Sequence, residues 1–251
     1  MKFVVIGGTG RIGSRLVASL KHLGHVAVPA APETGVDILT GEGLAEALTG
    51  ADVVVDLANS PSFADEAVMA FFQTAGRNLL AAEEKAGVRH HVALSIVGAD
   101  RLPDSGYLRA KVEQERLVKA SSIPYSLVRS TQFLPFIDGI IASAQADGEI
   151  RLSTALMQPI HPDDVVEALV AVATGEPLNG TVEIGGPEAM SIGEFAEAYL
   201  AARSDPRRVI ADPSAPYFGA VLEERSLIPG LGARLGMITL QAWLRESVVA
   251  D

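Results

Sequence analysis

The sequence contains no cysteine and no long apolar run, and each absence excludes a class of protein. Without cysteine there are no disulfides, thiolate metal sites or cysteine nucleophiles. A reducing compartment is compatible with this, so we expect a cytoplasmic protein. Nowhere do 18 apolar residues run together, and the first apolar run, Phe3–Ile6, is too short for the core of a signal peptide. We therefore expect neither membrane insertion nor export.

Basic residues are also scarce. The chain has 20 lysines and arginines against 31 acidic residues, which gives a net charge of -11 at pH 7. A nucleic-acid backbone or an anionic membrane would be repelled by this charge at long range. We expect no nucleic-acid or membrane partner, so a small-molecule substrate and further copies of the chain are the partners that remain open.

The residues that are present favour a well-packed α/β domain. With 251 residues, of which 48% are hydrophobic, the chain can bury a sizeable core. Short apolar strands alternate with helical stretches through the first half of the chain, and such strands indicate a parallel sheet covered on both faces. The expected strands are Lys2–Ile6, His25–Pro29, Val53–Leu57, His91–Ser95 and Pro124–Arg129, and the expected helices are Arg11–Leu23, Gly43–Leu48 and Ala64–Ala86. The fold class is therefore α/β, a doubly wound parallel sheet of the Rossmann type.

Beyond Ser130 the alternation loosens. We expect helices over Asp163–Thr174 and Ile192–Ala202, a strand over Thr181–Ile184, and then a segment rich in proline over Arg203–Gly236. There are no repeats and no flexible linker. We expect one domain over residues 1–251, in which residues 131–160 and 186–251 contribute a small C-terminal lobe.

A glycine cluster lies at the first strand-to-helix turn, in the stretch VVIGGTGRIGSRL at residues 4–16. Gly8, Gly10 and Gly13 match the G-x-G-x-x-G pattern, and Gly7 with the last two matches a related spacing. At this turn the pyrophosphate of a dinucleotide faces the helix N-terminus and its amides. The alternative is a tight turn with close helix packing.

A second motif joins Tyr107 to Lys111, four residues apart in a stretch that Asp104 or Ser105 can cap as a helix. Both side chains would share one helix face, where the ammonium would stabilise the phenolate and lower the pKa of Tyr107. Ser95, at the end of an expected strand, would polarise a substrate carbonyl. Coincidental spacing is the alternative.

Two groups of residues contain side chains that can bind metal ions, but their positions argue against a metal site. His90 and His91 are neighbours on a strand and point to opposite faces, so they cannot chelate one ion together. His161, Asp163 and Asp164 surround Pro162, a combination typical of a helix start. We expect no metal.

Several further motifs accompany these two, and with them the chain resembles the short-chain dehydrogenase/reductase superfamily, in its extended and atypical branch with the NmrA-like NAD(P)-binding proteins. The motifs are GGTGRIG at 7–13, LANS at 57–60, ALSIVGAD at 93–100, YLRAK at 107–111, IPYSLVRSTQF at 123–133, PIHPDDVVEAL at 159–169 and VEIGGPEAMSIGEFA at 182–196. The resemblance implies a substrate-side role for the small lobe and catalytic roles for Ser95, Tyr107 and Lys111. It also implies a set of cofactor contacts, namely Gly7, Thr9, Gly10, Arg11, Ile12, Gly13, Leu57, Ala58, Asn59, Lys111, Ser130 and Thr131.

Three functions are compatible with this pattern. The favoured one is an NAD(P)H-dependent oxidoreductase that reduces a small carbonyl, enone or quinone-like compound. The alternatives are a redox sensor that binds NAD(P) without turnover and, least favoured, a sugar-nucleotide epimerase or dehydratase. Ala30 and Ala31 stand where an acid would hold the ribose of NAD, and Arg11 lies in the glycine loop, which slightly favours NADP(H) over NAD(H). Glu33 and Asp37 remain able to reach a ribose.

Overall fold

The computed structural model describes residues 1–146 and 149–249, which fold as two compact units. The first unit comprises residues 1–95, 106–129 and 165–182. The second comprises residues 96–105, 130–164 and 183 onward, and it includes the segments 131–160 and 186–251 assigned above to a small lobe. No helix in the described part of the chain is both long and apolar enough to cross a bilayer.

The central sheet is doubly wound, as the sequence predicts. Among the described residues it has seven strands in the order β12-β9-β5-β4-β3-β1-β2. The bounds are β1 Lys2–Ile6, β2 Val26–Ala30, β3 Val53–Asp56, β4 His90–Ile96, β5 Tyr125–Ser130, β9 Gly180–Gly185 and β12 Arg234–Leu235. The pairs β1–β2, β1–β3, β3–β4 and β9–β12 are parallel. The strand order reverses beside β1, which has β2 on one side and β3 on the other, and such a switch point opens a crevice at the carboxyl ends of the strands.

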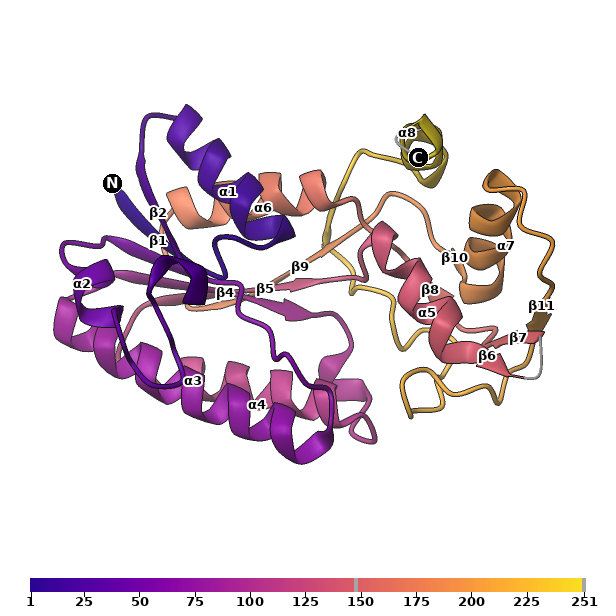
Figure 1. The fold of residues 1–251 in the computed structure, drawn as a ribbon, viewed down its shortest axis with the longest axis horizontal. Coiled ribbons are helices and arrows are strands. Elements are labelled where there is room, and N and C mark those ends of the chain that lie inside the picture. The colour runs from indigo at the N-terminus through magenta and orange to yellow at the C-terminus, as the bar shows by residue number, and fades with distance from the viewer. Residues whose placement is uncertain (147–148, 250–251) are drawn as a thin grey trace. The chain divides into compact units, whose positions relative to one another are not determined.

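Helices cover both faces of the first unit. In Figure 1, α1 and α6 lie on one face of the sheet, and α3 and α4 lie side by side on the other. Their bounds are α1 Arg11–His22, α2 Leu44–Leu48, α3 Asp65–Ala86, α4 Gly106–Ala120 and α6 Pro162–Thr174. In α1 the buried residues Gly13, Leu16, Val17 and Leu20 recur at helical spacing, which gives the helix one apolar stripe toward the sheet.

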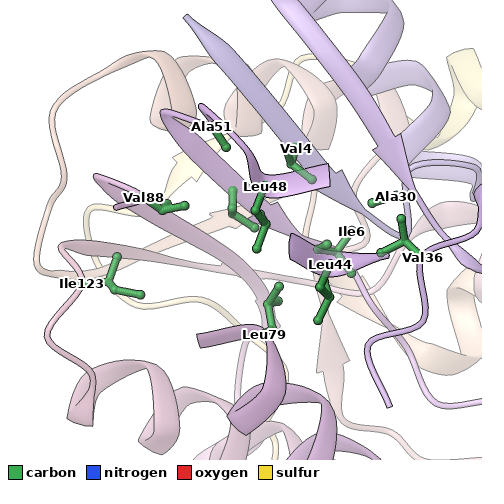
Figure 2. Close-up of a cluster of buried hydrophobic side chains, with 11 residues drawn as sticks. Val4, Ile6, Ala30, Val36, Leu44, Leu48, Ala51, Leu79, Val88 and Ile123 are labelled. Atoms are coloured by element: carbon green, nitrogen blue, oxygen red, sulfur yellow. The ribbon is translucent and has the colours of Figure 1, made fainter. Parts of the chain in front are cut away.

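The core between the sheet and α2 and α3 is aliphatic (Figure 2). Val4 and Ile6 of β1 point into it with Leu44 and Leu48 of α2 and Leu79 of α3, all at most 2% exposed. Full burial of one such side chain is worth roughly 1.5–3 kcal/mol relative to exposure. This packing fixes the end of β1, and with it the start of the glycine loop.

The expected strands and helices are confirmed, with small shifts at their ends. The expected helix Gly43–Leu48 begins at Leu44, because Gly43 has a left-handed backbone (φ 72°) and lies so close to Gly35 that a Cβ would overlap its carbonyl oxygen. The helix predicted to begin near Pro162 does begin there, as α6.

The second unit contains elements that the sequence pattern did not reveal, among them α5 (Ile137–Ala144) and α8 (Leu240–Val249). Helix α7 (Ile192–Ala202) was expected, and it opens on a capping box between Ser191 and Glu194. The small strands are β6 Gln145–Ala146, β7 Glu149–Leu152 and β11 Val209–Ala211 in one sheet, and β8 Leu156–Met157 with β10 Met190–Ser191 in another. Single 3₁₀ turns cover Pro32–Thr34, Ala99–Arg101 and Leu134–Phe136.

Candidate dinucleotide and proton-transfer site

The glycine loop connects β1 to α1, and its glycines allow close backbone packing. At Gly13 an added Cβ would overlap the Gly7 carbonyl oxygen, so this residue serves close packing of the helix on the loop. At Gly10 an added Cβ would lie 3.3 Å from the Gly7 carbonyl oxygen. The loop is held by hydrogen bonds from Gly7 N–H to Ala30 O (2.8 Å) and from Gly10 N–H to Gly7 O (3.0 Å).

The N-terminus of α1 is suited to an anion. Gly10 is the N-cap and offers no side-chain acceptor, and the first turn carries no acidic residue. The first N–H groups of a helix have no intrahelical acceptor and lie at the positive end of the helix dipole. These residues fit the pyrophosphate of a dinucleotide, which supplies the missing acceptors.

The loop after β3 lies against the glycine loop. The Leu57 N–H donates to Ile6 O at 3.1 Å, and the Leu57 carbonyl oxygen would lie 2.9 Å from a Cβ added to Gly7. The Ala58 N–H donates to the Asp56 carboxylate at 2.9 Å, which fixes the turn at the end of the strand. The structure therefore brings together Gly7, Leu57 and Ala58, which the sequence assigns to one cofactor.

Charges of opposite sign flank the glycine loop. The Thr9 hydroxyl donates to the Glu33 carboxylate at 3.3 Å, so this acid folds back to the loop. Arg11 is exposed at the start of α1. Sequence reasoning gave Glu33 a secondary place because it stands past the end of β2; the turn Pro32–Thr34 is what returns it.

Tyr107 lies in the first turn of α4, where its hydroxyl donates to Asn59 Oδ1 at 3.1 Å. Its ring meets Phe63 edge-on at 5.1 Å and Phe72 at 6.4 Å. Burial raises the pKa of Tyr107 to about 12, although the hydrogen bond with Asn59 opposes the rise. The expectation that Lys111 lowers this pKa is therefore wrong for the structure: desolvation of the phenol is the larger effect.

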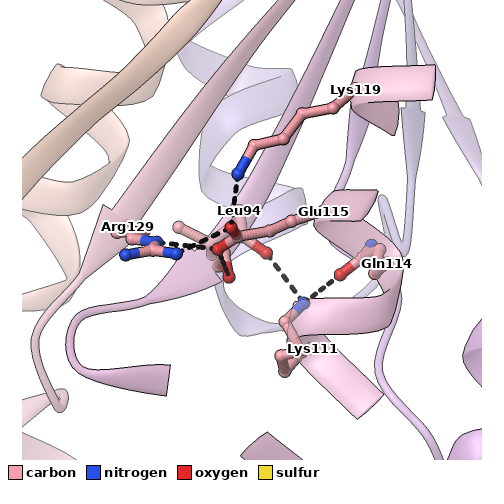
Figure 3. A network of polar contacts seen from close by, with 7 residues as sticks. Leu94, Lys111, Gln114, Glu115, Lys119 and Arg129 are labelled. Atoms are coloured by element: carbon pink, nitrogen blue, oxygen red, sulfur yellow. Dashed lines mark hydrogen bonds and ion pairs between the residues drawn. The ribbon is translucent and has the colours of Figure 1, made fainter. Parts of the chain in front are cut away.

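Lys111 is buried one turn after Tyr107, and its ammonium points to protein acceptors (Figure 3). Nζ donates to the Leu94 carbonyl at 2.8 Å and to the Gln114 amide oxygen, and it lies 4.7 Å from the centre of the Phe72 ring. Gln114 in turn donates to Asp56 at 2.7 Å. Burial lowers the pKa of Lys111 to about 8, opposed by the negative charges of Asp56 and Glu115.

Ser95 does not offer its hydroxyl to a substrate in this structure. Successive side chains of a strand alternate between the two faces of the sheet, and Ser95 lies on the face of β4 that packs on α4. It is 3% exposed and donates to Glu115 at 2.7 Å. Glu115 also accepts two hydrogen bonds from Arg129, both at 2.8 Å (Figure 3). The expected role for Ser95 is thus corrected to a partner of a buried carboxylate.

Two expected cofactor contacts, Ser130 and Thr131, belong to the second unit. Ser130 closes β5, and its hydroxyl donates to the Thr131 carbonyl at 2.8 Å. The Thr131 hydroxyl donates to Gln158 O at 2.6 Å. Both are buried, and their role toward a cofactor stays a prediction.

The three histidines at the two groups considered as metal sites, His90, His91 and His161, have protein partners. His90 Nε2 lies 2.8 Å from the Ser126 hydroxyl, and His91 Nδ1 lies 2.9 Å from both Glu83 oxygens. His161 Nδ1 accepts the Asp163 N–H at 3.2 Å, as fits the start of α6. In the described ranges no group of three histidine and acidic side chains could hold a metal ion.

Comparison with known proteins agrees with this geometry. A family model described as NAD(P)H-binding matches residues 7–174. A curated relative, the photosystem II assembly factor Ycf39 of Synechocystis, is 26% identical over an alignment of 216 residues. The alignment covers 78% of this chain and 66% of that protein, just under two thirds of its length.

Solved structures share the fold at low sequence identity. A short-chain dehydrogenase/reductase superfamily protein from Agrobacterium tumefaciens with bound NAD has a TM-score of 0.74 and 19% identity, over 100% of this chain and 97% of its own. The UDP-glucose 4-epimerase of Thermus thermophilus in complex with NAD has a TM-score of 0.75 and 19% identity, over 99% and 98%. The resemblance stated from the sequence motifs is confirmed at the level of fold.

Proposed function

The chain belongs to the NAD(P)H-binding family, and on that premise we propose that it is an NAD(P)H-dependent oxidoreductase that reduces a small carbonyl, enone or quinone-like compound. The observation that carries the proposal is the place of Tyr107. Its hydroxyl lies 3.1 Å from Asn59, in the loop that adjoins the glycine loop at the switch point of the sheet. A proton donor is therefore held beside the loops that fit the dinucleotide.

The proposed step needs one proton from the protein. When bound at the glycine loop, the reduced cofactor would supply a hydride to the carbonyl carbon. Tyr107 would donate its proton to the carbonyl oxygen, which takes the electron pair of the C=O bond, so that an alcohol and a phenolate result. A pKa of about 12 keeps the phenol protonated at neutral pH, and an alkoxide is a stronger base than a phenolate, so transfer is downhill.

Lys111 would stabilise the phenolate and contact the nicotinamide ribose. It lies one helical turn from Tyr107, and its Nζ gives two of its three N–H donors to Leu94 and Gln114. Charge on Lys111 is available below a pH of about 8.

For the adenosine end, the position of Glu33 outweighs the slight preference for NADP(H) drawn from the sequence. A carboxylate accepts hydrogen bonds from ribose hydroxyls and repels a 2′-phosphate. Glu33 lies 3.3 Å from Thr9 on the glycine loop, which supports NAD(H) as the better ligand.

A second candidate function is a redox sensor that binds NAD(P) without turnover. The observation that favours it is that Ser95 and Lys111 point to protein partners rather than to an open site. The relative Ycf39 is also named as an assembly factor and not as an enzyme.

The deciding experiment combines binding with turnover. NADH and NADPH are titrated by fluorescence, and the protein is then screened with aldehydes, ketones, enones and quinones for loss of absorbance by the reduced nicotinamide. Steady consumption supports the oxidoreductase. Tight binding with no turnover across the panel supports the sensor, and no binding of either nucleotide contradicts both.

A further inference from the structure

We propose that Asn59 is a positioning residue for the Tyr107 hydroxyl, and that the loop Asn59–Ala64 is built to hold this phenol. The inference rests on the proposed function, because it assigns how that reaction's proton donor is oriented. Sequence reasoning placed Asn59 on the cofactor alone; the structure directs its side chain to Tyr107.

The amide of Asn59 is itself fixed. Its Oδ1 accepts the Ser60 N–H at 3.0 Å as well as the Tyr107 hydroxyl at 3.1 Å. An amide oxygen has two lone pairs, so both bonds are compatible. Because the first bond ties the side chain to its own backbone turn, the acceptor keeps its place while Tyr107 is protonated.

The same loop holds the aromatic ring of Tyr107. Phe63 is 59% exposed, yet its ring meets Tyr107 edge-on at 5.1 Å with an interplanar angle of 68°. Edge-to-face pairs of this kind are favourable by about 0.5–1.5 kcal/mol beyond burial. Phe72 of α3 packs on Tyr107 at 6.4 Å, so the ring contacts both the loop and α3.

Both ends of the loop are tied to the start of α4. At one end Asn59 binds Tyr107, and immediately after the other end Asp65 pairs with Arg109 at 2.7 Å. A Cβ at Gly106 would overlap the Asp65 carboxylate, so the first residue of α4 and this side chain approach each other closely. The loop that adjoins the cofactor site is thus fastened to the helix that carries the proton donor.

This arrangement predicts an effect on the chemical step and not on binding. While its O–H points to Asn59, the phenol oxygen stays beside the loops that fit the dinucleotide, and the O–H turns to the substrate oxygen when that oxygen arrives. Without Asn59 the phenol side chain is held less firmly, and fewer encounters place its oxygen within reach of the substrate. Asn59→Ala should lower kcat by roughly 10- to 100-fold. The KM of the substrate and the Kd of the reduced cofactor should stay within about twofold, because uniform binding is unchanged.

A double-mutant cycle makes the test specific. In a Tyr107→Phe background, Asn59→Ala should cost no further activity, because there is no hydroxyl left to orient. Ser122→Ala, a change outside this loop at a hydroxyl that donates to Glu84, should leave kcat unchanged. An equal loss with and without the Tyr107 hydroxyl, or a loss of cofactor affinity at unchanged kcat, would overturn the proposal.

The hydrogen bond can also be tested without turnover. The chain has 4 tyrosines, so protein labelled with ¹³C at tyrosine Cζ gives a simple spectrum in which Tyr107→Phe removes one line. Asn59→Ala should shift that same line and leave the others. A shifted line with no enzyme activity would disprove the proposed function while keeping the bond, whereas an unshifted line disproves the positioning role directly.

Discussion

The residue with the most unusual environment is Lys111, an ammonium with 4% exposure on the sheet side of α4. It avoids the full cost of a buried charge by donating hydrogen bonds to Leu94 O and to the Gln114 amide oxygen. The Gln114 amide nitrogen in turn donates to Asp56. The low pKa of about 8 follows from this burial. Lys111 is therefore charged below a pH of about 8 and neutral above it.

Turnover should fall above a pH of about 8, as Lys111 loses the proton that stabilises the phenolate. We expect kcat/KM for carbonyl reduction to decline by a factor of ten per pH unit above that point, which is the slope of one ionisation. A flat profile to pH 10 would show that Lys111 takes no part.

The pH dependence of stability provides the control for this activity profile, because the free energy of unfolding should rise with pH where activity falls. The pKa of Lys111 is lower in the folded chain than the ordinary value of 10.5 for a lysine, so charging Lys111 below pH 8 costs the folded form stability. That cost is relieved as pH rises from about 8 to 10.5, since the unfolded chain binds more protons there. Urea unfolding should show wild type gaining stability relative to Lys111→Met across this window, which separates loss of activity from denaturation.

Cofactor preference depends on two residues beside the glycine loop. We expect NADH to bind more tightly than NADPH, and Glu33→Gln to narrow or reverse the difference by removing repulsion of the 2′-phosphate. Arg11→Ala should weaken NADPH more than NADH. Fluorescence titration of both nucleotides with each variant measures this, and tighter NADPH binding to the wild type would refute the assignment to Glu33.

At single residues the sequence was a partial guide. The glycines and the Tyr107–Lys111 spacing could be read because they depend on local backbone geometry. The partners of Ser95 and Glu33 could not be predicted. The partner of Ser95 depends on which face of β4 meets α4, and that of Glu33 depends on the 3₁₀ turn after β2. Nor did spacing alone show that burial raises the pKa of Tyr107.

Among the elements, α4 carries most of the candidate chemistry. Tyr107, Lys111 and Glu115 follow one another at intervals of four residues, so they line one face of the helix. The Glu115 carboxylate forms a bidentate pair with Arg129. It also accepts hydrogen bonds from the Ser95 hydroxyl at 2.7 Å and from Lys119 Nζ at 3.2 Å. Burial alone would raise the pKa of Glu115, but hydrogen bonds from Arg129 and Ser95 bring it below its usual range. This carboxylate thus fastens α4 to β4 and β5.

Glu115→Ala should lower the free energy of unfolding by about 3–5 kcal/mol, because it leaves the guanidinium of Arg129 largely buried without its carboxylate. We expect this loss of stability at neutral pH and not in acid. Because the pKa of Glu115 is lowered in the folded chain, the carboxylate stabilises the fold only at a pH where it is ionised. Urea denaturation measures it.

Glu113→Ala is the matched control. Glu113 lies two residues earlier on the same helix and pairs with Arg116; the side chain of Arg116 is 60% exposed and that of Glu113 is 15% exposed. Because the guanidinium of this pair stays in solvent, the pair contributes about 0–1 kcal/mol. Equal losses in the two variants would show that the Glu115 network adds nothing beyond a surface ion pair.

The elements of the first unit were the most predictable part of the fold. Buried parallel strands such as β1 and β3 contain unbroken apolar runs, Phe3–Ile6 and Val53–Val55, and this pattern stands out from the helices between them. Helices α5 and α8 escaped detection because α5 is only 8 residues long and α8 follows an irregular segment rich in proline and glycine.

For the molecule as a whole, the order of strands decides where the site lies. Because β2 and β3 lie on opposite sides of β1, the loops after β1 and β3 meet at the switch point. The first unit alone carries both loops, Tyr107 and Lys111. A net charge of -11 disfavours anionic substrates, which agrees with the proposal of a small neutral carbonyl or quinone-like compound.

The most direct test of Tyr107 as the proton donor is turnover by Tyr107→Phe with a substrate found by the screen. We predict an unchanged Kd for the reduced cofactor and a loss of about two to four orders of magnitude in kcat, because only the transferred proton is removed. Turnover at the wild-type rate would contradict this prediction and show that the Tyr107–Lys111 pair is structural.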